Sequence, residues 1–283
     1  MSAAAANCAL RTRMLSAADG TQLHVSDHIL DGAQGGIVIM HGLGEHSGRY
    51  PHVVQFFNEC GLSVRTYDHR GHGKSQGARG DVPAGDAILQ DAQIVIEDFT
   101  AQLGSVPLLF GHSMGGLFAA RFALGKMAPL RGLILSSPAL ALPMSGAQKL
   151  LLSVLSKIAP GLAVSNGLPL HGLSRDPAVA AAYKNDALVH GKITARLLLR
   201  MLDAMAFCHA NAATLSIPAL MVVAGSDKLV DASGSRAFFP QLPPTLASMH
   251  WYDEGYHELH NDVNARQVFA DERNWLQARR FIA

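Results

Sequence analysis

Hydrophobic residues along this chain follow two patterns, short continuous apolar runs and longer stretches with helical spacing. The runs occupy residues 36–40, 62–67, 105–110, 133–135, 218–225 and 248–252. Continuous runs of this length are typical of strands buried in a parallel sheet. The stretches between them repeat apolar residues every three or four positions, as amphipathic helices do. Because the two patterns alternate, the sequence predicts an α/β fold, with a mostly parallel sheet and helices on both faces.

The two ends of the chain differ from this pattern. Residues 21–30 alternate apolar and polar side chains after the Asp19-Gly20 turn, which predicts an early hairpin strand. Residues 262–281 predict a closing helix. Residues 1–18 show neither pattern, and we expect them to form a loose tail. The first ten residues also lack the basic and long apolar regions of a signal peptide.

Between residues 140 and 215 the alternation breaks, and we find no credible buried strand. The first part of this region is a helical stretch with an apolar stripe made of Ala147, Leu150, Leu151, Val154, Leu155 and Ile158. A loop-rich section with three prolines follows, and then a second helical stretch is predicted over residues 192–209. We therefore predict a helical cap at 140–215, inserted between two parts of an α/β core at 1–139 and 216–283.

Composition limits the class of function. The chain has 283 residues, 49% of them hydrophobic, and a formal net charge of +1, which gives no electrostatic reason to bind nucleic acid. Three widely spaced cysteines cannot build a disulfide framework, and this suits a reducing compartment. No apolar run reaches the roughly 18 residues of a membrane span. We expect a soluble, cytoplasmic protein that acts on a small organic or lipid substrate.

The most informative motif is Gly111-His112-Ser113-Met114-Gly115-Gly116, which stands between a predicted strand and a predicted helix. A G-x-S-x-G sequence in that context is typical of a nucleophile elbow, where a sharp turn presents the serine above the sheet. The helix start also favours negative charge close to Ser113. The alternative is a glycine-rich turn that caps a helix, and it requires no base or acid further along the chain.

A serine nucleophile needs a general base, and the base needs an orienting acid. In nucleophile-elbow enzymes these follow the serine in the order acid then histidine, each after a late strand. Asp227 and His257 occupy those places, so we predict the catalytic triad Ser113, Asp227 and His257. Asp231 is an alternative acid, more simply explained as a helix N-cap, and His260 is an alternative base.

We expect no metal and no cofactor. His257 and His260 are three residues apart, which is not the H-E-x-x-H spacing that places two ligands on one helical face. His69 and His72 lie in a predicted turn without carboxylate or thiol companions at ligand spacing. There is also no G-x-G-x-x-G opening a helix, as a dinucleotide site requires.

Five segments together resemble the monoacylglycerol lipase and lysophospholipase group of α/β-hydrolases, of the serine aminopeptidase S33 type. The segments are residues 41–50, 68–75, 111–116, 225–231 and 256–260. The resemblance weakens through the predicted cap. It implies an eight-stranded α/β-hydrolase sheet and an oxyanion hole formed by the backbone N–H groups of Leu43 and Met114.

The same resemblance implies a polar pocket for the alcohol part of the substrate, formed by Glu45, Arg49, Tyr183 and His260. For Glu45 and Arg49 the alternative is a structural ion pair within a loop. We expect the segment 68–75 to be structural, a hydrogen-bonded turn that braces the loop carrying Leu43.

These observations favour a serine hydrolase that cleaves monoacylglycerol to fatty acid and glycerol through an acyl-enzyme. A lysophospholipase or general carboxylesterase is the alternative within enzymes, and a non-catalytic small-ligand-binding protein is the alternative outside them. The apolar stripe of the cap could line an acyl tunnel or serve ordinary packing. It could also make weak contact with a membrane surface, with Lys149 and Lys157 giving little electrostatic attraction. The oligomeric state is not specified by the sequence.

Overall fold

A computed structural model describes residues 8–83 and 85–283 and contains one eight-stranded sheet. The strands follow the order β1-β2-β4-β3-β5-β6-β9-β10. β2 is antiparallel to β1 and β4, and the remaining neighbours are parallel. The strands are β1 (Cys8–Ser16), β2 (Gln22–Leu30), β3 (Gly35–Met40), β4 (Leu62–Tyr67), β5 (Leu108–His112), β6 (Leu133–Ser136), β9 (Ala219–Ala224) and β10 (Ala247–Tyr252).

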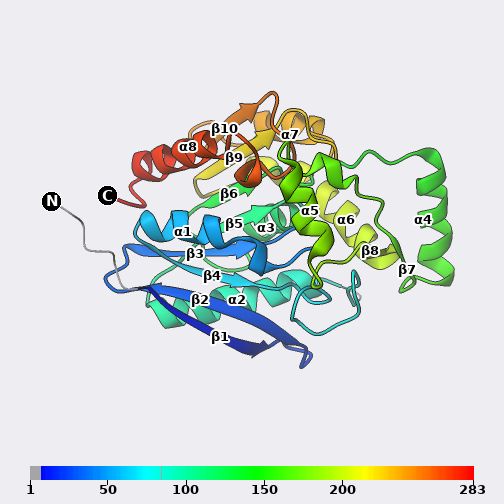
Figure 1. Cartoon of the computed structure of the whole chain (residues 1–283), viewed down its shortest axis with the longest axis horizontal. Coiled ribbons are helices and arrows are strands. Elements are labelled where there is room, and N and C mark those ends of the chain that lie inside the picture. The colour runs from blue at the N-terminus through cyan, green and yellow to red at the C-terminus, as the bar shows by residue number, and fades with distance from the viewer. Residues whose placement is uncertain (1–7, 84) are drawn as a thin grey trace.

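Helices cover both faces of the sheet (Figure 1). α1 (Pro51–Glu59) and α8 (Ala265–Ala278) pack on one face, and α2 (Ala87–Leu103), α3 (Met114–Leu124) and α7 (Ser233–Phe238) pack on the other. Side chains of β3 alternate between the two resulting cores, because successive residues of a strand point to opposite faces. The predicted α/β class, with its mostly parallel sheet, is confirmed.

The predicted loose tail is wrong for residues 8–16. They form β1, which pairs with β2 from Cys8 opposite Leu30 to Ser16 opposite Gln22. β1 is an edge strand with mostly exposed side chains, so main-chain hydrogen bonds rather than apolar burial hold it. A search for hydrophobic patterns therefore misses it. The rest of the predicted tail, residues 1–7, lies outside the described residues.

A mostly helical segment between β6 and β9 extends from one end of the sheet. It contains α4 (Gly146–Ile158), α5 (Pro177–Asn185), α6 (Ala195–Asn211) and two short strands, β7 (Ala163–Ser165) and β8 (Lys192–Thr194). The short strands pair with each other, so this segment is not free of strands. They also shorten the helix predicted from residue 192, because the Thr194 side chain caps α6 by accepting from the Leu197 amide at 3.2 Å.

We call this segment the cap and refer to it as residues 140–215. Figure 1 shows α4 standing away from the sheet, at the end of the molecule opposite the described chain termini. In the part of the chain that the structure describes, no helix combines the length and the apolar character needed to cross a membrane.

Candidate active site

The predicted catalytic side chains all follow the carboxyl ends of strands. Ser113 follows β5, Asp227 lies three residues beyond β9, and His257 lies five residues beyond β10. The loop with Leu43 follows β3. Since parallel strands end at the same edge of a sheet, four separate segments converge at one place.

Ser113 has the strained backbone of a tight strand-to-helix turn, with φ 56° and ψ −119°. Such a conformation costs a non-glycine residue on the order of 1–3 kcal/mol. Close packing of strand and helix fixes the turn: a Cβ at Gly111 would lie 2.5 Å from the Gly115 carbonyl oxygen. A Cβ at Gly115 would lie 2.3 Å from the carbonyl oxygen of Met40. A side chain at either position would clash with these carbonyl oxygens, so both positions require glycine.

His257 and Asp227 form a buried pair. The Nδ1 atom of His257 lies 2.6 Å from Oδ2 of Asp227, and their side chains are 3% and 1% exposed. Asp227 also accepts through Oδ1 from the amides of Leu229 at 2.8 Å and Val230 at 3.0 Å. Burial alone would lower the pKa of His257, but the Asp227 carboxylate outweighs it and raises that pKa above its ordinary value. The pairing leaves Nε2 of His257 as the ring nitrogen available for proton transfer.

Ser113 and His257 line the same cavity, and among the described residues no direct hydrogen bond joins their side chains. Such contacts are often loose before substrate binds. The alternative acid lies elsewhere, because Asp231 accepts from the Ser233 amide at the start of α7. Asp227 is therefore the carboxylate that the structure places on His257.

His112, to which sequence reasoning gave no role, packs its ring against His257 with the centroids 4.7 Å apart. A buried chain of contacts continues behind it. His112 Nδ1 lies 3.2 Å from Ser136 Oγ, which lies 3.5 Å from His260 Nδ1, and His260 Nε2 lies 2.9 Å from Glu272 Oε1. Burial first, and then His257, lower the pKa of His112 to about 3, so this ring is neutral. A neutral ring adds no charge beside the His257 imidazole.

The two residues expected to form an oxyanion hole lie at the same cavity. Leu43 and Met114 both line it, together with Ser113. Leu43 donates no backbone hydrogen bond among the described residues, and Met114 is the first residue of α3, whose N–H has no partner within the helix. These are the two donors that the resemblance implies for an oxyanion hole.

The segment 68–75 holds the loop that carries Leu43. Asp68 accepts through Oδ1 from the Ser47 amide at 2.8 Å and through Oδ2 from the Lys74 amide at 2.7 Å. The His69 amide donates to His41 Nε2 at 3.0 Å. These hydrogen bonds connect the segment to both sides of the loop that carries Leu43, as expected.

The residues expected for an alcohol pocket divide into two groups. Glu45 and Tyr183 line the cavity at Ser113. Arg49 lies behind the wall, where it is ion-paired with Glu45 at 2.6 Å. His260 is also absent from the wall, because Glu272 and Ser136 hold its ring in the core. Glu258, which sequence reasoning did not single out, lines the cavity instead.

A larger apolar cavity adjoins the one at Ser113. The inner cavity has a volume of about 40 Å³ and the outer one about 260 Å³. Five residues line both cavities, which therefore share part of their walls: Leu43, Leu142, Leu168, Met201 and Leu229. From the cap, Leu151, Leu152 and Leu155 of α4 contribute to the outer wall. Part of the predicted apolar stripe therefore lines a cavity next to the one at Ser113.

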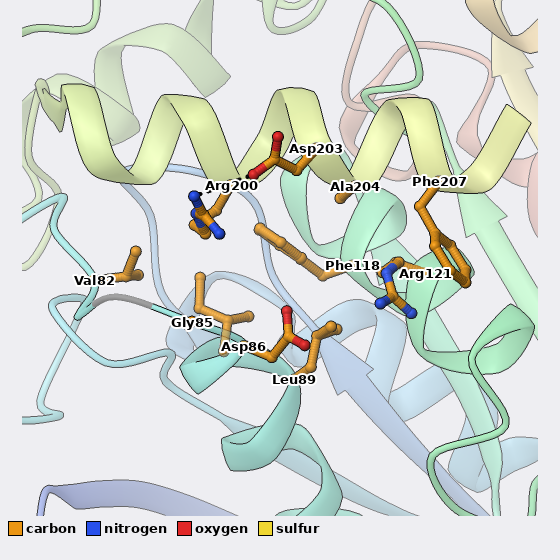
Figure 2. A pocket seen from close by; sticks show the side chains of 11 residues that line it. Val82, Gly85, Asp86, Leu89, Phe118, Arg121, Arg200, Asp203, Ala204 and Phe207 are labelled. Carbon is orange, nitrogen blue, oxygen red and sulfur yellow. Dashed lines mark ion pairs between the residues drawn. The ribbon is translucent and has the colours of Figure 1, made fainter. Parts of the chain in front are cut away.

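A separate cavity of about 200 Å³ lies between the start of α2, α3 and α6 (Figure 2). Arg200 pairs with Asp203 at 3.1 Å on its rim, and the guanidinium of Arg121 lies 3.5 Å from the centroid of the Phe207 ring. None of the predicted site residues lines this cavity. Within residues 8–83 and 85–283, no group of three or more His, Cys, Asp or Glu side chains is arranged to hold a metal ion.

This chain is similar in sequence to a known protein family and to several named proteins. A family profile described as serine aminopeptidase, S33, matches residues 31–264. The chain is 35% identical over 257 residues to the monoacylglycerol lipase of Mycolicibacterium smegmatis, a match covering 86% of this chain and 88% of that protein. It is 33% identical over 247 residues to an abhydrolase domain-containing protein of Dictyostelium discoideum, but spans only 26% of that protein's length.

The fold has a solved counterpart. The crystal structure of Paleococcus ferrophilus monoacylglycerol lipase superposes with a TM-score of 0.82 at 34% identity, covering 91% of this chain and 99% of that one. The α/β-hydrolase fold implied by the sequence motifs is therefore confirmed, and the family match runs from the end of β2 to the start of the closing helix. The chain belongs to the serine aminopeptidase, S33, family and is an enzyme of the hydrolase class.

Proposed function

We propose that this protein is a serine carboxylic ester hydrolase that cleaves monoacylglycerols, with Ser113, His257 and Asp227 as its catalytic triad. The observation that carries the proposal is the buried His257–Asp227 pair, 2.6 Å long, in the same cavity as a serine at a strained elbow. A capping turn at Ser113 would not require such a pair nearby. The monoacylglycerol lipases among the relatives support the substrate class.

In the first half of the reaction, Ser113 Oγ attacks the ester carbonyl while His257 Nε2 takes its proton. The Asp227 carboxylate accepts from Nδ1–H of His257 and stabilises the imidazolium that forms. The carbonyl oxygen becomes an oxyanion, to which the Leu43 and Met114 amides donate. Each donor of this kind lowers the barrier by about 3 kcal/mol. His257 then gives its proton to the departing glycerol oxygen.

In the second half, water attacks the acyl-enzyme with His257 again acting as base, and the fatty acid leaves. The acyl chain occupies the apolar outer cavity between α4, α6 and Leu229. The glycerol lies on the side of Glu45, Tyr183 and Glu258. Two carboxylates on that wall, balanced by one buried arginine, favour a neutral alcohol over the anionic phosphate in the head group of a lysophospholipid.

We also propose that α4 makes weak, reversible contact with lipid surfaces. Leu150 and Ile158 are 68% and 74% exposed, and Leu151 and Val154 beside them are 52% and 44% exposed. Apolar side chains on one exposed helix suit shallow insertion into the interface, and few cations accompany them.

The test is a substrate panel of monoacylglycerols, lysophosphatidylcholines and short p-nitrophenyl esters, run with wild-type protein and Ser113→Ala. We expect monoacylglycerol to give the highest kcat/KM and Ser113→Ala to lose turnover of all three. A fluorophosphonate probe should label the wild type and not the variant. Retained turnover in Ser113→Ala would overturn the mechanism. Preference for the lysophospholipid would overturn the substrate class but leave the mechanism intact.

A further inference from the structure

The guanidinium of Arg49 lies where three distant segments meet. Its Nη1 atom lies 2.6 Å from Glu45 Oε2 and 2.7 Å from Glu258 Oε1, while Nη2 lies 2.9 Å from Glu258 Oε2. Its flat face lies against the Tyr183 ring of the cap, 4.7 Å from the ring centroid. The side chain is only 11% exposed. Three of its N–H donors are thus committed to Glu45 and Glu258, and Arg49 does not line the cavity that would receive the alcohol.

Glu45, Arg49 and Glu258 form a bridge between two loops. Its Glu45 end holds the loop after β3. Oε1 of Glu45 accepts from the Gly42 amide at 2.6 Å and from the Tyr50 hydroxyl at 2.6 Å. Gly42 immediately precedes Leu43. Burial alone would raise the pKa of Glu45, but the charge of the Arg49 guanidinium is the first of the effects that outweigh burial and lower this pKa to about 2. The ionised Glu45 side chain therefore fixes the backbone that presents the Leu43 N–H.

The other end holds the loop after β10. Glu258 is the neighbour of His257, and its Oε2 atom also accepts from Asn261 Nδ2 at 2.8 Å. Its amide donates to the Leu173 carbonyl of the cap at 2.8 Å. A bidentate arginine–carboxylate contact is both stronger and more directional than a single hydrogen bond. It therefore fixes the backbone from which the His257 imidazole projects.

The sheet does not set the distance between these two loops directly. β5, β6 and β9 lie between β3 and β10 in the sheet. No ladder of main-chain hydrogen bonds therefore joins the strand that leads to Leu43 with the strand that leads to His257. The Glu45–Arg49–Glu258 bridge connects them across the top of the sheet.

We propose that Arg49 is a positioning residue that, through Glu45 and Glu258, holds the oxyanion donor Leu43 in register with the general base His257. This inference rests on the proposed function. Misplacement of a reacting group by about 1 Å can cost roughly 100-fold in rate. The bridge therefore acts on the chemical step, in contrast to the alcohol-binding role that the resemblance implies for Arg49.

The bridge also sets charge around the base. His257 faces the carboxylate of Asp227 from the loop after β9, Glu45 from the loop after β3 and Glu258 from its own loop. From β5 it faces the neutral His112 ring. From the cap, the Gly172 carbonyl accepts from the backbone amide of His257 at 3.4 Å, and Tyr183 lines the same cavity. Arg49 is the cation that balances Glu45 and Glu258. Loss of the Glu258 charge therefore lowers the pKa of His257, and loss of the Arg49 charge raises it.

Steady-state kinetics over a range of pH test the proposal on the full chain with a p-nitrophenyl ester. We expect Arg49→Gln to lower kcat about 100-fold with KM changed less than threefold, and to move the acid limb of kcat/KM to higher pH. Glu258→Gln should lower kcat and move that limb to lower pH. Arg49→Lys, which keeps the charge but cannot bridge in the same way, should lower kcat with the limb unmoved.

Controls separate this proposal from the proposed function and from misfolding. Arg200→Gln removes an arginine from an ion pair that does not line the cavity at Ser113, and this variant should behave as wild type. Melting curves identify a variant that does not fold, in which case Glu258→Gln and Arg49→Lys carry the test. Wild-type kcat in Arg49→Gln, a loss confined to KM, or limbs that move in the same direction would overturn the bridge. Turnover by Ser113→Ala would instead overturn the proposed function.

Discussion

The sheet edge and the cap meet at one cavity but are built by different interactions. At the sheet edge, Asp227 and His257 are almost fully buried, and short hydrogen bonds fix them. In the cap, α4 buries only Leu152 among its 13 residues, and its other apolar side chains are partly or largely exposed. Polar contacts demand one geometry, whereas exposed apolar contacts tolerate many. Under the proposed function, the reaction takes place at the sheet edge and the cap selects the acyl chain.

We expect the largest effect from a substitution at the sheet edge. Asp227→Asn keeps the size of the side chain but loses the charge that holds His257 in its tautomer, so we expect kcat to fall about 10⁴-fold. The measurement is p-nitrophenyl acetate hydrolysis, with Asp231→Asn as the matched control at wild-type rate. If both variants behave alike, the edge does not depend on this pair.

The pH dependence of the edge should follow from His257. The base must be neutral in the free enzyme, and its pKa is raised by Asp227 against the opposing effect of burial. Activity is therefore present above this raised pKa and lost below it, with kcat/KM falling about tenfold per pH unit. Profiles for a short ester and a monoacylglycerol should share this acid limb, because the cap contributes no titrating group to it. Limbs that differ between the two substrates would contradict the division of roles.

A cap substitution should change selectivity and spare the chemistry. Leu155→Trp fills part of the outer cavity, so we expect kcat/KM for a long-chain monoacylglycerol to fall about 10- to 100-fold, in the range that hydrophobic pockets discriminate. Turnover of p-nitrophenyl acetate should stay within about twofold of wild type. An equal loss for both substrates would show that the cap also sets the geometry of the edge.

The smallest effect concerns the exposed face of α4. Leu150→Ser and Ile158→Ser remove apolar groups from solvent without touching the outer cavity. We expect a fewfold weaker association with neutral phosphatidylcholine liposomes in flotation, and unchanged hydrolysis of a dissolved ester. No association of the wild-type protein in the same assay would remove the proposed lipid contact.

The sequence predicted the structure best where apolar runs form buried strands and where the spacing of glycines marks a tight turn. Buried strands such as β3 and β9 are wholly apolar, so their ends could be located, and with them the positions of Ser113, Asp227 and His257. The roles of these three residues remain predictions until they are measured. β1 was missed because an edge strand with exposed side chains has no apolar signature.

The sequence did not predict which polar side chains from distant segments would pair with each other. His260 was expected to touch substrate, but Glu272, fully buried on α8, draws its ring into the core. Glu258 carries no signal of its own beside His257, and its pairing with Arg49 joins residues 209 positions apart. Hydrogen-bond partners of this kind depend on how helices and loops dock, which the local pattern of a single sequence does not record.

The contacts of Gly115 carry a consequence for how this protein tolerates change. Every other amino acid has a Cβ, and at this position that atom would lie 2.3 and 2.4 Å from two carbonyl oxygens, those of Met40 and His41. In a saturation library, all nineteen replacements should therefore deplete together, whatever their chemistry. Position 115 would then look like a catalytic residue in the selection data, although it reacts with nothing and is constrained only by the closeness of two main chains.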